Sequence, residues 1–460
     1  MKIVCKDTST FMENDELKNL REKINILDDK ILELLKDRAD IVSEIGKHKN
    51  SLEKIVDLSR EQKILNRLIT NAKTKYSKDT IVRIWRELFK ASSKLQLVND
   101  EYIQTKRSIE SIEVYKGGKS NILGLKNVIK LSSNENSHGP STSVIKLVNS
   151  DKFFSNYHRY PEINGETLRN AIAHKHGIEA ERIVLGCGSD ETLLFSALSF
   201  CQDGDEIIYA EHGFEMYSII SKIVGATSKT IKEDDSYKIS VQSILDEITV
   251  ASKLIYIANP NNPTGTYLSR LEIVNIMKKI PKHVIVVLDG AYAEYVMKED
   301  YDKGFSLVDE FDNLIITRTF SKAYGLAGLR IGWCYSSKKV SNILKKVKGP
   351  FNTTAFAQNL AILALKDQEH INNVVMTNAE VKSWFEKELK KLNLITSPSE
   401  GNFSFVEATE NKAKEISNHL IQSGILVRQL NSYNLPNCLR ITIGTKTEME
   451  ATINCLKNFK

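Results

Sequence analysis

Thr317-Arg-Thr-Phe-Ser-Lys-Ala-Tyr-Gly-Leu-Ala-Gly-Leu-Arg-Ile-Gly332 carries the chemistry around which the rest of this sequence is arranged. It overlaps the end of an apolar run, Leu314-Ile-Ile316, that indicates a buried parallel strand. Lys322 comes soon after that strand, and Arg330 follows it with two glycines between them. A lysine held at a strand end beside a cation can lose its proton and attack a carbonyl carbon. Ser321 and Arg330 can hold a phosphate, the arginine through two parallel hydrogen bonds.

A carbonyl compound with a phosphate handle suggests the aldehyde pyridoxal phosphate, with Lys322 as the lysine that forms a Schiff base with it. A lysine alone is weak evidence in a chain with so many solvated lysines, whereas the order of residues in the whole string is informative. The string resembles the cofactor-lysine segment of fold type I aminotransferases. The resemblance implies that Lys322 is catalytic and that Ser321 and Arg330 bind the cofactor, pyridoxal 5'-phosphate.

Composition sets outer limits on what the chain can be. At 460 residues we expect two or three domains. A net charge of +6 is too mild to imply nucleic acid, but it leaves room for a basic pocket that takes an acidic metabolite. The six cysteines lie far apart, so neither a disulfide framework nor a metal site is indicated. No apolar run reaches membrane-spanning length and the first residues do not form a signal peptide, so we expect a cytoplasmic protein without a membrane partner.

The first hundred residues have a helical pattern. Apolar residues recur at steps of three and four, which predicts one helix from about residue 16 to 48, roughly 50 Å long; these are Leu17, Leu20, Ile24, Leu27, Ile31 and Leu34. Ser59-Arg-Glu-Gln62 predicts a capping box that opens a second helix, and a third begins near Ser77. The prediction is an all-α, three-helix domain whose first helix is too long to bury itself, so we expect a homodimer.

Residues 14–98 resemble the all-helical, type II chorismate mutases. The matching strings are Leu20-Arg-Glu-Lys-Ile24, Leu27-Asp-Asp-Lys-Ile-Leu-Glu-Leu-Leu35, Glu44-Ile-Gly-Lys-His-Lys49 and Asp57-Leu-Ser-Arg-Glu61. The resemblance implies a set of site residues, with Arg21 supplied by the partner subunit; the set is Arg21, Arg38, Lys49, Asp57, Arg60, Glu61, Ser92 and Gln96.

These residue types suit the rearrangement of chorismate to prephenate, which needs neither a nucleophile nor a proton transfer. The enzyme must hold a dicarboxylate in its reactive conformation and stabilise negative charge that grows on the ether oxygen. Arginines suit the carboxylates, whereas Lys49 and Gln96 suit the ether oxygen. The competing hypothesis is a DNA-binding helix-turn-helix domain, which needs short helices and phosphate-facing cations. One long helix with Arg38 in its apolar seam favours the mutase.

We place a domain boundary near residue 105, between residues 1–104 and residues 105–460. From Leu131-Ser-Ser-Asn-Glu-Asn136 onwards the chain resembles the histidinol-phosphate and aromatic aminotransferases. Strand-like runs alternate with helical ones, which predicts an α/β fold with a large parallel sheet covered on both faces. We expect a large domain over about residues 150–345, and a small domain formed by the N-terminal arm and about residues 346–460.

Candidate cofactor residues stand at the predicted strand ends, where ligands of parallel sheets bind. The turn Gly186-Cys-Gly-Ser-Asp-Glu191 can cradle a phosphate at a helix N-terminus, through Ser189 and Asp190. Asn262 can donate to the ring hydroxyl oxygen of the cofactor, and Tyr292 can bond the same oxygen. Asp289 can keep the pyridine nitrogen protonated, which makes the ring an electron sink.

The same resemblance implies further residues. Tyr160 matches a tyrosine that reaches the cofactor phosphate from the neighbouring subunit, Arg440 the clamp on the substrate carboxylate, and Arg428 a second anion-binding arginine. Two positions depart from the family pattern. Phe214 replaces the usual tyrosine over the cofactor ring, which keeps the stacking and loses a hydroxyl, and Gly290 replaces a glutamate, a change we expect to matter little.

The sequence therefore predicts a fused chorismate mutase and pyridoxal-phosphate aminotransferase of aromatic amino-acid biosynthesis. Fusion to a mutase favours an aromatic keto acid or prephenate as amino acceptor, with a donor such as glutamate. Two alternatives remain open: a histidinol-phosphate aminotransferase that carries a mutase domain, and a helical domain that only senses chorismate or aromatic compounds.

Overall fold

The structure is a computed structural model that describes residues 15–48, 57–71, 74–96, 105–115, 117–118, 121, 128–150, 158–408 and 412–459. The chain divides into two compact units, residues 1–104 and residues 105–460, and each is described by itself below. In these described ranges, every helix is too short or too polar to cross a membrane.

The described part of the first unit consists of three helices: α1 (Asp15–Lys47), α2 (Leu58–Asn71) and α3 (Lys78–Gln96). This confirms the predicted all-α fold and the long first helix. Ser77 caps α3, because its hydroxyl accepts from the backbone N–H of Thr80 at 3.1 Å. The start of α2 differs from the predicted capping box at Ser59. The carboxylate of Asp57, a stronger acceptor than a hydroxyl, receives the N–H of Arg60 at 2.9 Å, and the helix begins one residue earlier.

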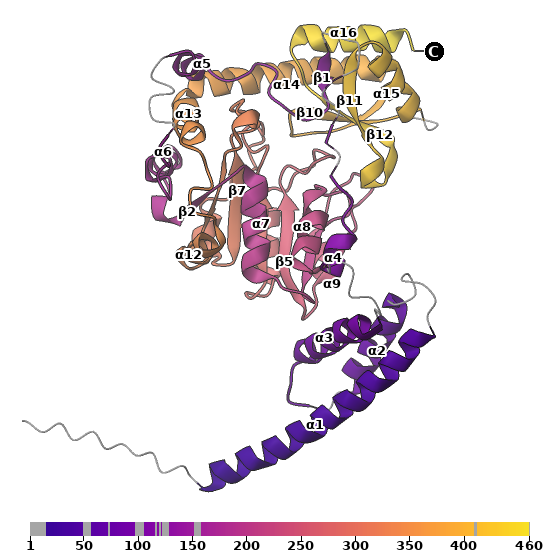
Figure 1. Cartoon of the computed structure of the whole chain (residues 1–460). Helices are drawn as coiled ribbons and strands as arrows, with labels where there is room; N and C mark the ends of the chain where they lie inside the picture. Colours follow the sequence, from indigo (N-terminus) through magenta and orange to yellow (C-terminus); the bar gives the residue numbers. More distant parts are fainter. Residues whose placement is uncertain are drawn as a thin grey trace, which may run out of the picture. The chain divides into compact units, whose positions relative to one another are not determined.

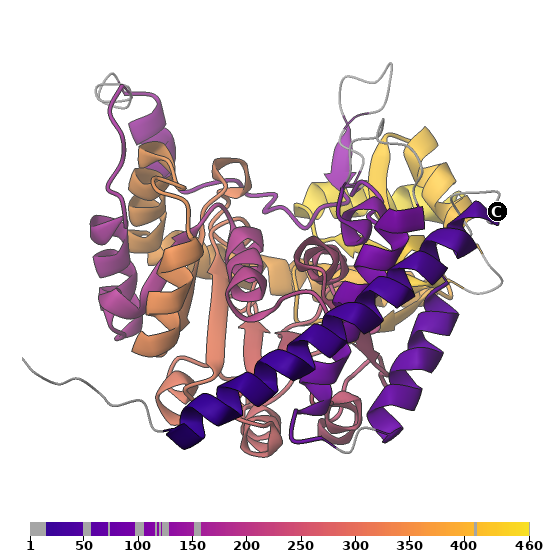
Figure 2. The same cartoon turned by 60° about the horizontal axis from the view of Figure 1, so that its bottom comes forward.

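Among the described residues of the first unit, only the C-terminal half of α1 packs against other helices. Val42 of α1, Leu65 of α2 and Phe89 of α3 form a small buried core. Figures 1 and 2 show the N-terminal half of α1 extending past α2 and α3. Its apolar seam lies in solvent: Leu20 is 51% exposed, Ile24 56% and Ile31 54%.

The second unit is built on a seven-stranded sheet in the order β2-β8-β7-β6-β5-β3-β4. The strands are β2 (Ile183–Gly186), β3 (Glu206–Ala210), β4 (Thr227–Ile231), β5 (Ser252–Ala258), β6 (Ile285–Asp289), β7 (Leu314–Thr319) and β8 (Gly332–Ser336). All pair in parallel except β8, which is antiparallel to both of its neighbours. The sheet is thus mixed where a parallel one was expected. β8 returns directly after the Lys322 loop without a long crossover helix, and such a short connection favours an antiparallel pair.

Helices cover both faces of this sheet, as the uninterrupted apolar strands predicted. One core contains alternate strand residues packed against α6 (Glu166–His176), α10 (Arg270–Lys279) and α13 (Ala355–Lys366). The opposite core packs the remaining strand residues against α7 (Ser189–Phe200), α8 (Met216–Val224) and α12 (Lys338–Val347). Figure 1 shows α7 and α8 side by side in front of β5 and β7. Shorter helices complete this part: α5 (Thr142–Val148), α9 (Val241–Glu247) and α11 (Leu307–Glu310).

A smaller sheet has the order β1-β11-β12-β10-β9. Its strands are β1 (Ile129–Leu131), β9 (Ile395–Ser397), β10 (Phe403–Glu407), β11 (Ile425–Leu430) and β12 (Leu435–Thr442). The helices packed on it are α14 (Gln368–Lys391), α15 (Ala413–Gln422) and α16 (Lys446–Lys457), as Figure 1 shows. β1 pairs in parallel with β11, so the segment before the large sheet contributes a strand to the C-terminal one. Ahead of it, α4 (Arg107–Glu110) packs on α8.

Candidate functional site

The carboxyl ends of the central strands open into a cavity of about 290 Å³ between the large and the small sheet. It brings together residues that lie far apart in the sequence. Nine predicted cofactor residues and both predicted substrate arginines line it; these are Ser189, Asp190, Phe214, Asn262, Asp289, Tyr292, Ser321, Lys322, Arg330, Arg428 and Arg440. Tyr160 does not line it. Its side chain is 82% exposed and stacks on Phe351 with the ring centroids 4.6 Å apart.

Lys322 lies in the loop that follows β7 and points into the cavity. Its Nζ donates to the carbonyl oxygen of Ser133 at 3.2 Å and lies 5.5 Å from the centroid of the Tyr292 ring. Among the described residues that line the cavity, it is the one lysine. The amine therefore has a fixed place beside the strand ends and retains hydrogens for a further partner.

Asp289 is the last residue of β6 and is 5% exposed. The hydroxyl of Tyr217 donates to its Oδ2 at 2.9 Å, and the hydroxyl of Thr317 donates to its Oδ1 at 2.9 Å. Burial raises the pKa of the Asp289 carboxyl, and the two hydrogen bonds oppose that rise because they favour the charged form. Both oxygens are held, so the carboxylate has one orientation. The sequence reasoning missed Tyr217 and Thr317, which become neighbours only through the fold.

The turn between β2 and α7 is shaped for an anion. Gly188 has φ +81°, and a Cβ there would lie 2.5 Å from Nη2 of Arg330. Arg330 donates from Nη1 to the Ser321 hydroxyl at 3.3 Å, and its Nη2 lies 3.3 Å from Oδ2 of Asp190. Backbone N–H groups at the start of α7, a hydroxyl and a guanidinium therefore converge, which is the donor set that a phosphate group requires.

A second cluster holds Asn262 and Tyr292. Arg440 donates from Nη1 to Oδ1 of Asn262, which leaves the amide nitrogen of Asn262 as a donor. The Tyr292 hydroxyl accepts from Nδ2 of Asn134 at 2.9 Å, and Thr442 donates to Oδ1 of the same asparagine at 3.0 Å. Asn134 belongs to a string quoted in the sequence analysis, but its contact with Tyr292, 158 residues later, was not foreseen.

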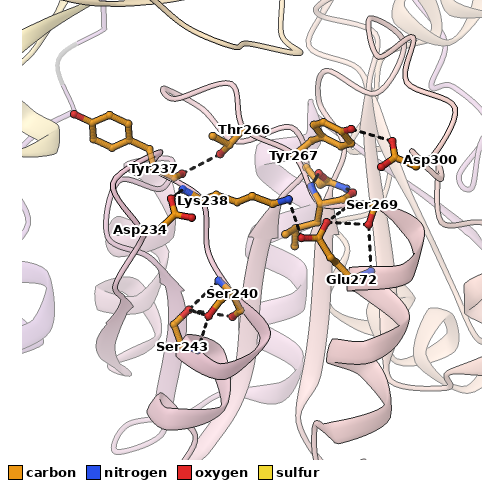
Figure 3. A network of polar contacts seen from close by, with 12 residues as sticks. Asp234, Tyr237, Lys238, Ser240, Ser243, Thr266, Tyr267, Ser269, Glu272 and Asp300 are labelled. Carbon is orange, nitrogen blue, oxygen red and sulfur yellow. Dashed lines mark hydrogen bonds and ion pairs between the residues drawn. The ribbon is translucent and has the colours of Figure 1, made fainter.

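Figure 3 shows side-chain contacts between the loop after β4 and the residues that lead into α10. Thr266 donates to the carbonyl oxygen of Tyr237 at 3.0 Å, and Nζ of Lys238 lies 2.7 Å from Oε1 of Glu272 at the start of α10. Asn261 donates to the carbonyl oxygen of His212 at 3.1 Å. The first two contacts connect the loop after β4 to residues that follow the Asn262 turn, and the third connects that turn to the loop after β3.

The two arginines that were predicted to bind substrate both line the cavity. Arg428 and Arg440 are directly opposite each other on β11 and β12. Like charges in that position repel, and each has a compensating partner. Nη2 of Arg428 lies 3.2 Å from Oε2 of Glu215, and Arg440 donates to the Ser132 carbonyl oxygen at 2.8 Å. Tyr115, which follows α4, lines the cavity together with them and was not identified from the sequence.

The structure brings together some of the predicted residues of the helical unit. Arg38 of α1 donates to the hydroxyl of Ser92 on α3. Gln96 lies against Gly46, where a Cβ would be 3.1 Å from the Gln96 Cγ, and its buried Oε1 has no hydrogen-bond partner among the described residues. These three side chains mark the packed end of α1.

The other predicted residues of that unit are more dispersed. Asp57, Arg60 and Glu61 lie at the start of α2, where Asp57 serves as the helix cap. Arg21 precedes Arg38 by 17 positions on one helix, which is about 25 Å. It is too far away to share a site with Arg38 of the same chain. Lys49 lies outside the described residues.

Comparisons with known proteins match both parts of the chain. Residues 126–456 match the family model described as aminotransferase class I and II, and residues 20–97 match the one described as chorismate mutase type II. A histidinol-phosphate aminotransferase from Ruegeria sp. (strain TM1040) is 41% identical over 353 residues, which cover 76% of this chain and 96% of the relative. One from Roseobacter denitrificans is 41% identical over 359 residues, covering 78% and 99%.

The fold has a solved counterpart. The crystal structure of histidinol-phosphate aminotransferase from Sinorhizobium meliloti, in complex with pyridoxal-5'-phosphate, superposes with a TM-score of 0.71 at 24% identity. The match covers 78% of this chain and 100% of that one.

Proposed function

Because this chain belongs to the aminotransferase class I and II family and carries a type II chorismate mutase domain in front, we propose that it is a bifunctional enzyme. The second unit would move an amino group between glutamate and the keto form of histidinol phosphate. The first would convert chorismate to prephenate. The observation that carries the aminotransferase substrate is the 41% identity to histidinol-phosphate aminotransferases along almost their entire length.

Pyridoxal phosphate is the cofactor of this aminotransferase class, and the cavity fits it. When bound, it supplies an electron-withdrawing ring that accepts the electron pair released as a substrate C–H bond breaks. The donors at the start of α7, with Ser321 and Arg330, suit its phosphate. Asp289 would keep a proton on the pyridine nitrogen, and Phe214 would cover one face of the ring. Lys322 would move the proton at the substrate carbon.

The two arginines support an amino donor and an amino acceptor that each carry two anionic groups. Arg440 suits a carboxylate such as that of glutamate, and Arg428 suits a second anion, either the distal carboxylate of glutamate or a phosphate. An aromatic keto acid would need only one of them. The mutase domain favours the aromatic keto acid as the second candidate substrate, since the mutase product, prephenate, is close to such a keto acid. The relatives support histidinol phosphate better than the aromatic substrate that the sequence analysis preferred.

The Arg428→Gln variant should separate the two candidates. Losing one charge-assisted hydrogen bond to the phosphate should lower kcat/KM for histidinol phosphate by about 10- to 100-fold, whereas the cofactor stays bound. Steady-state assays would measure it, with Arg270→Gln as control, an arginine paired with Asp302 outside the cavity. Unchanged turnover of histidinol phosphate, together with a loss for an aromatic substrate, would contradict the proposal.

For the mutase we propose a homodimer in which α1 from each chain completes the site of the other. The exposed seam on the N-terminal half of α1 supports it, and so does the separation of Arg21 from Arg38. In the second unit, the exposed Tyr160 supports the same arrangement, because its counterpart in the family reaches a neighbouring subunit's cofactor. Each site would then need residues from two chains.

The Gln96→Glu variant tests whether the residue donates to the ether oxygen of chorismate. Glutamate keeps the shape of glutamine but offers a hydrogen only while protonated, and its ordinary pKa is about 4.3. We expect the variant to be nearly inactive at neutral pH and to regain mutase rate as the pH falls, whereas the wild type shows no such acid-side gain. The pH dependence of prephenate formation would measure this. An unchanged mutase rate at pH 7 would exclude Gln96 as the donor.

A further inference from the structure

Arg318 is the last residue but one of β7 and is only 2% exposed. Its guanidinium donates from Nη1 to the Thr317 carbonyl oxygen at 2.7 Å and from Nη2 to the Lys303 carbonyl oxygen. It also lies over the ring of Phe305, with the central carbon 5.1 Å from the centroid. Burying a charge this deeply is costly in free energy unless an anion or hydrogen bonds compensate for it. Within the described residues, no carboxylate forms a salt bridge with it.

The space that Arg318 occupies exists because residue 290 is glycine. A Cβ on Gly290 would lie 1.9 Å from Nη1 of Arg318, so a side chain at this position would force the guanidinium to move. Gly290 directly follows Asp289, the carboxylate that would hold a proton on the pyridine nitrogen of the cofactor. The sequence analysis expected this departure from the family pattern to matter little. In the structure, the missing side chain at Gly290 leaves room for the buried guanidinium of Arg318.

We propose that Arg318 is a positioning residue for Asp289, as the buried cation that keeps this carboxylate charged and fixed, and that Gly290 provides its space. Thr317 connects the two groups. It is the register partner of Asp289 across β6 and β7, and its hydroxyl donates to Asp289 while its carbonyl accepts from both Gly290 N–H and Arg318. The inference rests on the proposed aminotransferase function, in which Asp289 must be ionised to hold a proton on the cofactor.

Burial raises the pKa of Asp289, and the hydrogen bonds from Tyr217 and Thr317 lower it. Of the charged groups, Asp190 raises this pKa and thus opposes ionisation, whereas Arg318 lowers it. Asp190 is itself close to Arg330.

The charge of Arg318 also acts on His176 and Glu294. Burial, with Arg318 and Lys303 adding to it, lowers the pKa of His176 to about 3, so that imidazole is neutral. Burial raises the pKa of Glu294, and one of its oxygens is buried without a hydrogen-bond partner among the described residues. Against this effect of burial, Arg318 and Lys303 lower the pKa of Glu294, so Arg318 acts on a second buried carboxyl besides Asp289.

The test is a pH titration of the absorption of the bound cofactor in Arg318→Gln. Without the cation, Asp289 should protonate at a higher pH, and the acid-side transition should move up by about one pH unit. Moving the transition by that amount changes the ratio of ionised to protonated Asp289 about tenfold, so kcat should fall by up to about tenfold near the transition while KM changes little. Arg318→Lys, which keeps a charge, should restore most of the wild-type profile.

A matched control removes a buried arginine elsewhere. Arg182 is 8% exposed, lies 4.6 Å from the centroid of the Tyr335 ring and donates to the Ser336 carbonyl oxygen. Arg182→Gln should lower the melting temperature as Arg318→Gln does but leave the cofactor titration unchanged. A wild-type titration in folded Arg318→Gln would overturn the inference.

A second route displaces the guanidinium without removing it, should Arg318→Gln not fold. Gly290→Ala places a methyl group against Nη1 and should move the titration in the same direction; it should add nothing further in an Arg318→Gln background. Gly349→Ala is its control, because a Cβ there meets only one atom, at 4.0 Å. An unchanged titration in Gly290→Ala would also overturn the inference. Failure of the wild type to bind pyridoxal phosphate would instead reject the proposed function, before any variant is compared.

Discussion

We expect Lys322→Ala to abolish transamination and to leave chorismate turnover unchanged. Lys322 is the one lysine among the described residues of the cavity, and it would both link covalently to the cofactor and move the proton at the substrate carbon. Loss of a general acid–base alone costs about 10²- to 10⁴-fold, and loss of the covalent link adds to it. We therefore expect a decrease in kcat of at least about 10⁴-fold.

Borohydride reduction followed by peptide mass spectrometry gives a readout that does not depend on activity. The wild-type protein should carry the reduced cofactor on the peptide that contains Lys322, and the variant should carry none. Lys298→Ala is a suitable control, since this lysine is half exposed near Glu400 and away from the cavity. Cofactor trapped on another lysine in the wild type would refute the assignment.

The Arg38→Ala variant should lose most of the mutase activity while transamination continues. Arg38 is held by Ser92 on the packed end of α1, where it can bind a substrate carboxylate. Removing one charge-assisted contact should cost about 2–4 kcal/mol of transition-state stabilisation, which is roughly a 30- to 1000-fold decrease in kcat/KM for chorismate. Steady-state formation of prephenate is the measurement, with the exposed Arg67→Ala on α2 as control.

Other outcomes would favour the alternatives for the helical unit. If the wild-type protein binds chorismate and never forms prephenate, the unit is a sensor. If it retards duplex DNA at physiological salt, it is a DNA-binding domain. An Arg38→Ala variant with full mutase activity would show that the site lies elsewhere on the three helices.

Features with a strong local signal could be predicted from the sequence. The three-and-four spacing of apolar residues predicted α1, and apolar runs followed by polar strings predicted β5, β6 and β7 with Asn262, Asp289 and Lys322 at or just after their ends. Parallel strands bring such ends to one edge of a sheet, so local patterns alone were enough to predict one cavity.

The contacts that depend on pairing between distant segments could not be predicted. Tyr217 and Thr317 hold Asp289 because the fold brings Tyr217 of α8 to the end of β6 and because the β6–β7 register places Thr317 opposite Asp289. Asn134 reaches Tyr292 only once the arm has entered the small sheet. The role of Gly290 was missed for the same reason, since the space beside it is defined by the Arg318 side chain on another strand.

The most direct test of the whole account is a steady-state comparison on one purified preparation of the full chain. It would measure kcat/KM for histidinol phosphate, for phenylalanine and for the amine of prephenate, and the rate of prephenate formation from chorismate. The account predicts that histidinol phosphate is preferred by at least about 100-fold over both aromatic substrates and that chorismate is converted in the same preparation. Equal or better turnover of an aromatic substrate, or no conversion of chorismate, would contradict it.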